Sequence, residues 1–160
     1  MSFVEDMFGL KGKTAIVAGG AGVIGTMMCG ALLKAGANVI IWSRAQASID
    51  QALAKFTENS SSKERLAGFR VDTGDESEVA GGLQHALRTF AAPEILVNAV
   101  GGVVGKAPLV ETDVKQFEQT LHLNLVAGLL ITTKVVAAYW IENDIKGSII
   151  NLTSMAAYNP

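Results

Sequence analysis

A short glycine-rich segment is the part of the sequence best suited to chemistry. Residues Gly19–Gly25 read Gly-Gly-Ala-Gly-Val-Ile-Gly, and from Gly20 onward they fit G-x-G-x-x-G. Glycine lacks a Cβ, so such a loop turns tightly and lets the backbone approach a pyrophosphate at the amino end of the next helix. A flexible turn that only packs a helix against a strand is the alternative. Because the loop stands between an apolar run and a helical pattern, we predict dinucleotide binding by these residues: Gly19, Gly20, Gly22, Val23, Ile24 and Gly25.

The end of the next apolar run bears on which dinucleotide would bind. Trp42 is followed by Ser43 and Arg44, and no acid stands at this tip. A carboxylate there would bind the ribose 2′-hydroxyl of NAD and repel a 2′-phosphate, whereas a guanidinium group binds a phosphate in a forked geometry. We therefore assign Ser43 and Arg44 to cofactor binding and favour NADP. NAD stays open, because Arg44 is also an ordinary residue for a solvated loop.

A third segment presents a polar residue close to the last residue of the sequence. Residues 147–154 read Gly-Ser-Ile-Ile-Asn-Leu-Thr-Ser, which predicts a buried strand that delivers Ser154 to its carboxyl end. Ligands in α/β folds bind at the carboxyl ends of the strands. We therefore expect Ser154 to belong to an active site.

These residues lie between elements that alternate along the chain. Apolar runs predict strands over 13–18, 38–42, 66–71, 94–98 and 148–152, and helical patterns cover 23–35, 48–58, 75–90 and 112–142. A polar loop is expected at 59–62. Such alternation indicates βαβ units, so the predicted fold class is α/β, a Rossmann-like, doubly wound parallel sheet. We expect one domain over residues 1–160, with the sheet incomplete on its C-terminal side.

Composition narrows the class of protein. Apolar residues make up 49% of the chain and charged residues 18%, which is typical of a soluble globular domain. A net charge of -2 gives no basic patch for nucleic acid. No apolar stretch is expected to span a membrane, and nothing resembles a signal peptide, so we expect a cytoplasmic protein. Cys29 is the only cysteine, and His85 and His122 are far apart, so we predict an inert core thiol and no metal site.

Taken in order, several of these segments resemble the short-chain dehydrogenase/reductase family. Residues 18–25 resemble its T-G-x-x-x-G-x-G loop, with Ala18 in place of the threonine and Val23 in place of the middle glycine. Residues 98–101 resemble its N-N-A-G segment and keep Asn98 and Gly101. Asp72, Asn124 and Ser154 stand where the family has an adenine-binding acid, a helix asparagine and a catalytic serine. The resemblance covers essentially the whole chain.

The resemblance implies hydride transfer between a nicotinamide dinucleotide and an alcohol or carbonyl substrate. It assigns cofactor contacts to Asp72, Thr73, Asn98, Ala99 and Gly101. Ser154 would hydrogen-bond the developing alkoxide, and Asn124 would hold a water of the proton relay.

The family's acid–base pair, a tyrosine followed four residues later by a lysine, is expected about a dozen residues after the serine. The sequence ends at Pro160, and Tyr158 follows Ser154 too closely for this role. We therefore expect a truncated chain that is inactive alone. The alternatives are a non-catalytic dinucleotide-binding protein and an interaction module. The sequence of residues 19–25, Gly-Gly-Ala-Gly-Val-Ile-Gly, also resembles the corresponding loop of fructuronate/mannonate-type sugar-acid reductases. This resemblance implies a sugar-acid substrate. The resemblance to the family further implies that the full-length protein forms a homo-oligomer.

Overall fold

The computed structural model describes residues 3–57 and 63–155, and these form a twisted parallel sheet between two layers of helices. The strand order is β3-β2-β1-β4-β5, and each neighbouring pair is parallel. The predicted α/β, Rossmann-like architecture is confirmed. The strands are β1 (Thr14–Ala18), β2 (Asn38–Ser43), β3 (Leu66–Arg70), β4 (Ile95–Asn98) and β5 (Ser148–Asn151).

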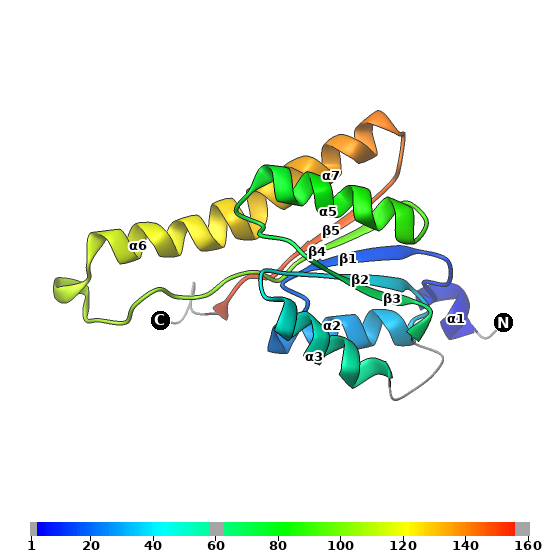
Figure 1. The fold of residues 1–160 in the computed structure, drawn as a ribbon, viewed down its shortest axis with the longest axis horizontal. Helices are drawn as coiled ribbons and strands as arrows, with labels where there is room; N and C mark the ends of the chain where they lie inside the picture. The colour runs from blue at the N-terminus through cyan, green and yellow to red at the C-terminus, as the bar shows by residue number, and fades with distance from the viewer. Residues whose placement is uncertain (1–2, 58–62, 156–160) are drawn as a thin grey trace.

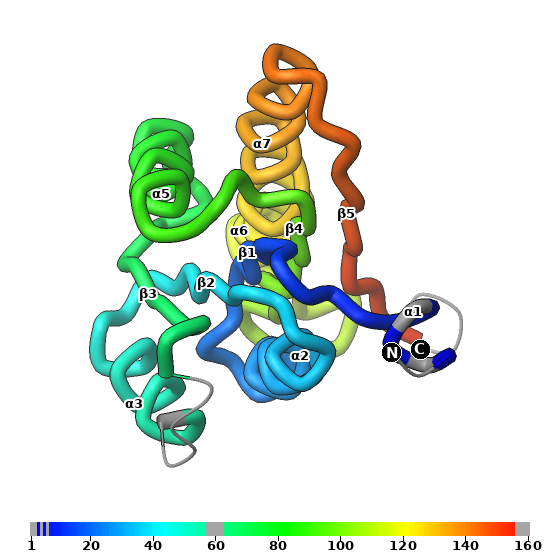
Figure 2. Tube along the Cα trace, turned by 90° about the vertical axis from the view of Figure 1, so that its right-hand side faces the viewer, coloured from blue at the N-terminus to red at the C-terminus, as the bar shows by residue number. Residues whose placement is uncertain are grey.

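Helices cover both faces of the sheet. On one side lie α2 and α3, and on the other lie α5 and α7 (Figure 2). A short helix, α1, precedes β1. Between β4 and β5, α6, η2 and α7 follow one another without a break and form one long helix, the helical rod (Figure 1). The bounds are α1 (Phe3–Phe8), α2 (Val23–Lys34), α3 (Gln46–Thr57), α5 (Glu76–Thr89), η1 (Leu109–Glu111), α6 (Val114–Leu121), the π-helical η2 (His122–Leu130) and α7 (Ile131–Glu142). The predicted loop at 59–62 lies outside the described residues.

The core has two halves because successive strand residues point to opposite faces. Val17 and Ile41 face α2 and α3, whereas Ile16, Ile40 and Trp42 face α5 and α7. All five residues of β1 are buried, which explains why this central strand is continuously apolar. Trp42 is fully buried and packs beside Gly82 of α5, so its indole is not available to flank a ligand.

Asp75 is the N-cap residue of α5, at the first residue of the helix predicted over 75–90. The Asp75 carboxylate accepts hydrogen bonds from the backbone N–H groups of Ser77 and Glu78, at 2.8 and 3.1 Å, and from the Ser77 hydroxyl at 2.6 Å. These bonds hold the pKa of Asp75 below its ordinary value, the Ser77 hydroxyl contributing most. Their stabilising effect is present above the ordinary pKa of aspartate and is lost as the pH falls through the lowered value.

The expectation of a buried last strand is wrong. In β5, Ser148, Ile150 and Asn151 are exposed, and the Ile150 side chain is 43% exposed. The reason is its place in the sheet, since β5 pairs with β4 alone and forms an edge. Only Ile149 packs against the core, on the α7 side. Over the described residues the sheet is therefore open at this edge.

The long helical rod also differs from the sequence-based expectation. Its span Val114–Glu142 is long and apolar enough to cross a membrane by length and composition, with a mean hydropathy of 1.6 over its most apolar 18 residues. We expected no such stretch. Core helices of soluble proteins, which are mostly buried, pass the same test. Here 22% of that 18-residue stretch is buried, and Val136 and Trp140 of α7 pack in the core.

Candidate functional site

Two loops meet where the order of the strands reverses direction. From β1 the chain passes to β2 on one side, whereas β4 lies on the other side of β1. The loop after β1 contains Gly19, and a Cβ on that residue would stand 2.8 Å from the carbonyl carbon and oxygen of Ala99, after β4. This point is the topological switch point, where open α/β sheets bind their ligands.

The glycine loop owes its shape to missing side chains. Gly19 has a φ of +77°, which lies in the left-handed region that side chains rarely adopt. A Cβ on Gly25, in the first turn of α2, would stand 2.2 Å from the Gly19 carbonyl oxygen. The turn and the helix can therefore approach closely only with glycine at both positions.

The amino end of α2 is open toward this switch point. Gly22 is the N-cap residue and supplies no side-chain acceptor for the first N–H groups of the helix. Val23 and Ile24 are 79% and 59% exposed, so their side chains do not close over the turn. An uncapped helix start with its N–H groups facing outward suits a pyrophosphate.

Cys29 lies beneath the loop and is not a reactive group. Its thiol is fully buried, and Sγ stands 3.8 Å from the Gly20 carbonyl oxygen. Burial raises the pKa of Cys29 to about 12, so the thiolate is not formed near neutral pH. The predicted position of the thiol in the core is confirmed.

The carboxyl ends of β2 and β3 contribute to a cavity of about 450 Å³. Arg44, Asp72 and the almost fully buried Thr73 line it together. Asp72 Oδ1 accepts the backbone N–H of Gly74 at 2.9 Å, which orients the carboxylate. Among the described residues, no carboxylate forms an ion pair with Arg44. The lining of the cavity thus includes one guanidinium, that of Arg44, two carboxylates, those of Asp72 and Asp75, and an apolar wall at Val100.

The side-chain amide of Asn98, the last residue of β4, forms hydrogen bonds within the protein through both its oxygen and its nitrogen. Its Oδ1 accepts the Thr132 hydroxyl at 2.7 Å, and its Nδ2 donates to Thr133 Oγ1 at 3.1 Å and to Asn151 Oδ1 at 2.8 Å. Asn98 and Thr132 are buried. These bonds tie the ends of β4 and β5 to α7, immediately before Ser154.

Asn124 holds the loop that follows β4. Its Oδ1 accepts the Gly102 N–H at 3.0 Å, and its Nδ2 donates to the carbonyl oxygens of Gly102 and Thr120, both at 2.7 Å. In a regular α-helix the Thr120 carbonyl oxygen would accept the backbone N–H of Asn124, and here the side-chain amide of Asn124 donates to the same oxygen. This competition accompanies the switch to π-helical geometry in η2, where Asn124 lies.

Ser154 follows β5 and is exposed. The Leu152 N–H donates to the Asn98 carbonyl oxygen at 3.0 Å, so the chain keeps to the β4 side just before Ser154. Tyr158 lies outside the described residues.

The structure adds residues that the sequence did not reveal as site candidates. His122, Gln119 and Val104 line the cavity that contains Arg44 and Asp72. His122 was considered from the sequence only as a metal ligand, and no pattern placed the helical rod beside the loop after β3. Only the tertiary path of the rod brings η2 to this cavity.

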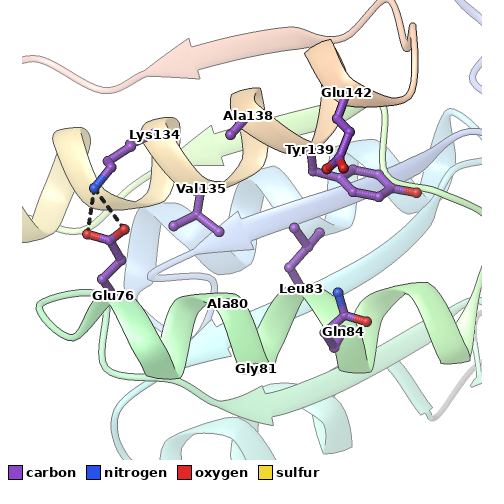
Figure 3. Close-up of a pocket in the computed structure, with 10 residues that line it drawn as sticks. All are labelled: Glu76, Ala80, Gly81, Leu83, Gln84, Lys134, Val135, Ala138, Tyr139 and Glu142. Atoms are coloured by element: carbon purple, nitrogen blue, oxygen red, sulfur yellow. Dashed lines mark hydrogen bonds and ion pairs between the residues drawn. The ribbon is translucent and has the colours of Figure 1, made fainter.

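A second groove lies on the outer side of α5 and α7, away from the loops just described. Glu76 and Lys134 form an ion pair at 2.8 Å at one end, and Leu83, Val135 and Tyr139 line the groove (Figure 3). Tyr139 is partly buried and packs against the core.

Comparison with known proteins agrees with this geometry. The sequence profile described as short chain dehydrogenase matches residues 13–160, nearly the whole chain. The chain belongs to the short-chain dehydrogenase family. The family implies a nicotinamide dinucleotide cofactor, and the switch point above fits one, because its glycine turn and uncapped helix start leave room for a pyrophosphate.

Several of the relatives that the chain matches are named as dehydrogenases. It is 31% identical over 150 residues to 3beta-hydroxysteroid dehydrogenase 2 of Eggerthella lenta, covering 92% of this chain and 55% of the relative. It is 28% identical over 154 residues to 2-dehydro-3-deoxy-D-gluconate 5-dehydrogenase of Formosa agariphila, covering 94% and 55%. The solved structure of sorbitol-6-phosphate 2-dehydrogenase from Erwinia amylovora superposes with a TM-score of 0.80 at 26% identity, covering 90% and 55%. The chain thus spans about half the length of the relatives it matches.

Proposed function

We propose that the protein is an NAD(P)-dependent oxidoreductase that transfers a hydride between nicotinamide and an alcohol or carbonyl carbon, and that residues 1–160 bind its dinucleotide. The contact between the Gly19 turn and Ala99 at the switch point is the observation that carries this proposal. A non-catalytic binding protein or an interaction module is less well supported, because the polar residues gather at this one edge.

Each candidate residue has a role in this proposal. The nicotinamide supplies the hydride chemistry when bound. The turn and the start of α2 would hold the pyrophosphate, Asp72 and Thr73 would contact the adenine, and Ala99 and Gly101 would border the nicotinamide half. Ser154 would hydrogen-bond the developing alkoxide. The relay-water role of Asn124 stays a prediction, since its amide already binds Gly102 and Thr120. We assign an acid–base role to no residue of this sequence.

The Arg44 guanidinium, which forms an ion pair with no carboxylate in the described part of the chain, supports a preference for NADP(H). We expect isothermal calorimetry to show tighter binding of NADPH than of NADH. Arg44→Gln should weaken NADPH binding by about ten-fold or more, because a charge-assisted hydrogen bond contributes about 1.5–3 kcal/mol. NADH binding should change by less than about two-fold, since NADH has no 2′-phosphate.

The matched control is Lys146→Gln, which removes one exposed cation from the loop before β5. This variant should bind both dinucleotides as the wild type does. Equal affinity of the wild type for NADH and NADPH would contradict the role of Arg44, and no binding of either would contradict the proposed function.

The substrate that we propose is a small sugar acid of the fructuronate or mannonate type. Two observations support an acidic substrate. A relative that matches 94% of this chain is a 2-dehydro-3-deoxy-D-gluconate 5-dehydrogenase. Lys106 lines a cavity of about 360 Å³ in the loop after β4, and no described carboxylate forms an ion pair with it. With dinucleotide present, saturation-transfer NMR should detect binding of D-gluconate and no binding of the neutral D-glucitol. Binding of D-glucitol without binding of D-gluconate would contradict an acidic substrate.

We also propose that the protein self-associates through the helical rod. Val114, Phe117, Leu121 and Leu125 recur every three or four residues, and between 43% and 69% of each is exposed. Such a stripe is the usual face for packing against another helix. Light scattering should give a multiple of 16.8 kDa, whereas a particle of 16.8 kDa would contradict self-association.

A further inference from the structure

The Thr120 hydroxyl joins the helical rod to the loop after β4. Its Oγ1 accepts the backbone N–H of Val104 at 3.0 Å and donates to the Gln116 carbonyl oxygen at 2.9 Å. The second bond is common for a threonine within a helix. The first reaches sixteen residues back along the chain and fixes a loop residue that has no strand partner.

Val104 is held at a place where its position matters to the proposed cofactor site. Its half-buried side chain lines the cavity that Arg44, Asp72 and Thr73 also line. The next residue, Gly105, has a φ of +76°, and a Cβ on it would overlap the Gln116 side-chain amide. The loop therefore turns sharply against α6 directly after Val104.

Thr120 and Asn124 form two successive attachments on one face of the rod, because residues four apart lie above one another in a helix. Asn124 binds both backbone groups of Gly102, and Thr120 binds the N–H of Val104. Asn124 belongs to the residues already assigned to the site. Thr120 does not, yet it alone of the two fixes the part of the loop that lines the cavity.

We propose that Thr120 is a positioning residue for the dinucleotide site, which acts by holding Val104 in the wall of the cavity that receives the adenosine half. The inference rests on the proposed function. Loss of the hydroxyl removes the hydrogen bond to the Val104 N–H and lets the loop move. Dinucleotide binding must then also order the loop, and the free energy of that ordering weakens the affinity. The expected cost is that of one net hydrogen bond, about three- to ten-fold in affinity.

The test compares Thr120→Val, which keeps the branched shape and removes the hydroxyl, with Thr120→Ser, which keeps the hydroxyl. The matched control is Thr89→Val in α5, whose hydroxyl donates to the His85 carbonyl oxygen of the same helix at 2.8 Å. Two readouts are needed. NMR amide exchange reports the protection of the Val104 N–H, and calorimetry reports the dissociation constants of NADPH and NADH.

In Thr120→Val we expect the Val104 N–H to lose its protection from exchange and the binding of both dinucleotides to weaken about three- to ten-fold. Thr120→Ser and Thr89→Val should match the wild type in both measurements. Unchanged protection in Thr120→Val would overturn the contact, and lost protection with unchanged affinity would overturn the positioning role. A wild-type protein that binds no dinucleotide would instead refute the proposed function, and with it the role of the cavity, while amide exchange would still report on the contact.

Discussion

Gly25→Ala is expected to abolish dinucleotide binding and to lower the free energy of unfolding by about 1–3 kcal/mol. The added Cβ would stand 2.2 Å from the Gly19 carbonyl oxygen and 2.8 Å from the Gly20 Cα, both backbone atoms that no side-chain rotation can move. Alanine is the better helix former by about 1 kcal/mol, and this gain is smaller than the cost of the overlap. Calorimetry with NADPH and urea denaturation measure the two effects.

The control for this change is Gly81→Ala in α5. Gly81 also lies within a helix, but a Cβ there would meet nothing within 4 Å. This variant should be more stable than the wild type by about 0.5–1 kcal/mol and should bind dinucleotide normally. If the two alanine variants behave alike, the close approach of α2 to the glycine turn does not control the site.

Asn98→Ala is expected to lower the free energy of unfolding by about 3 kcal/mol. The substitution leaves the buried Thr132 hydroxyl without its acceptor and removes both donors that bind Thr133 and Asn151. A buried polar group without a partner costs about 1–3 kcal/mol, and more than one group is affected. Denaturation in urea gives the change. In NMR spectra the resonances of β5 and Ser154 should shift, because β5 is an edge strand held by β4 and this network.

Asn143→Ala is the matched control for Asn98. Asn143 is exposed after α7, and its side-chain amide donates to the Tyr139 carbonyl oxygen at 2.9 Å. Its loss should cost less than about 1 kcal/mol. The network is coupled, so the double variant of Asn98 and Asn151 should lose less stability than the sum of the single alanine variants. A loss for Asn98→Ala no greater than for Asn143→Ala would refute the network.

Several parts of the fold could be predicted from the sequence because their causes are local. The five strands and the helices between them follow from apolar periodicity, and the predicted bounds lie within a few residues of the observed ones. The glycine loop was predictable for the same reason. The spacing of its glycines and its place directly after β1 specify a tight turn that only residues without a Cβ can form. Short-range patterns also indicated the start of α5 at Asp75.

The tertiary structure alone decided which of these elements meet. It made β5 an exposed edge, because burial of a strand depends on neighbours that its own sequence does not contain. It brought Val104, Gln119 and His122 to the cavity of Arg44 and Asp72, because the loop after β4 and the rod pass close to the loop that follows β3. It also showed the amide of Asn124 bound to Gly102 and that of Asn98 bound between β5 and α7. Local patterns report which groups a chain carries, whereas hydrogen-bond partners far apart in sequence follow from how the whole chain packs.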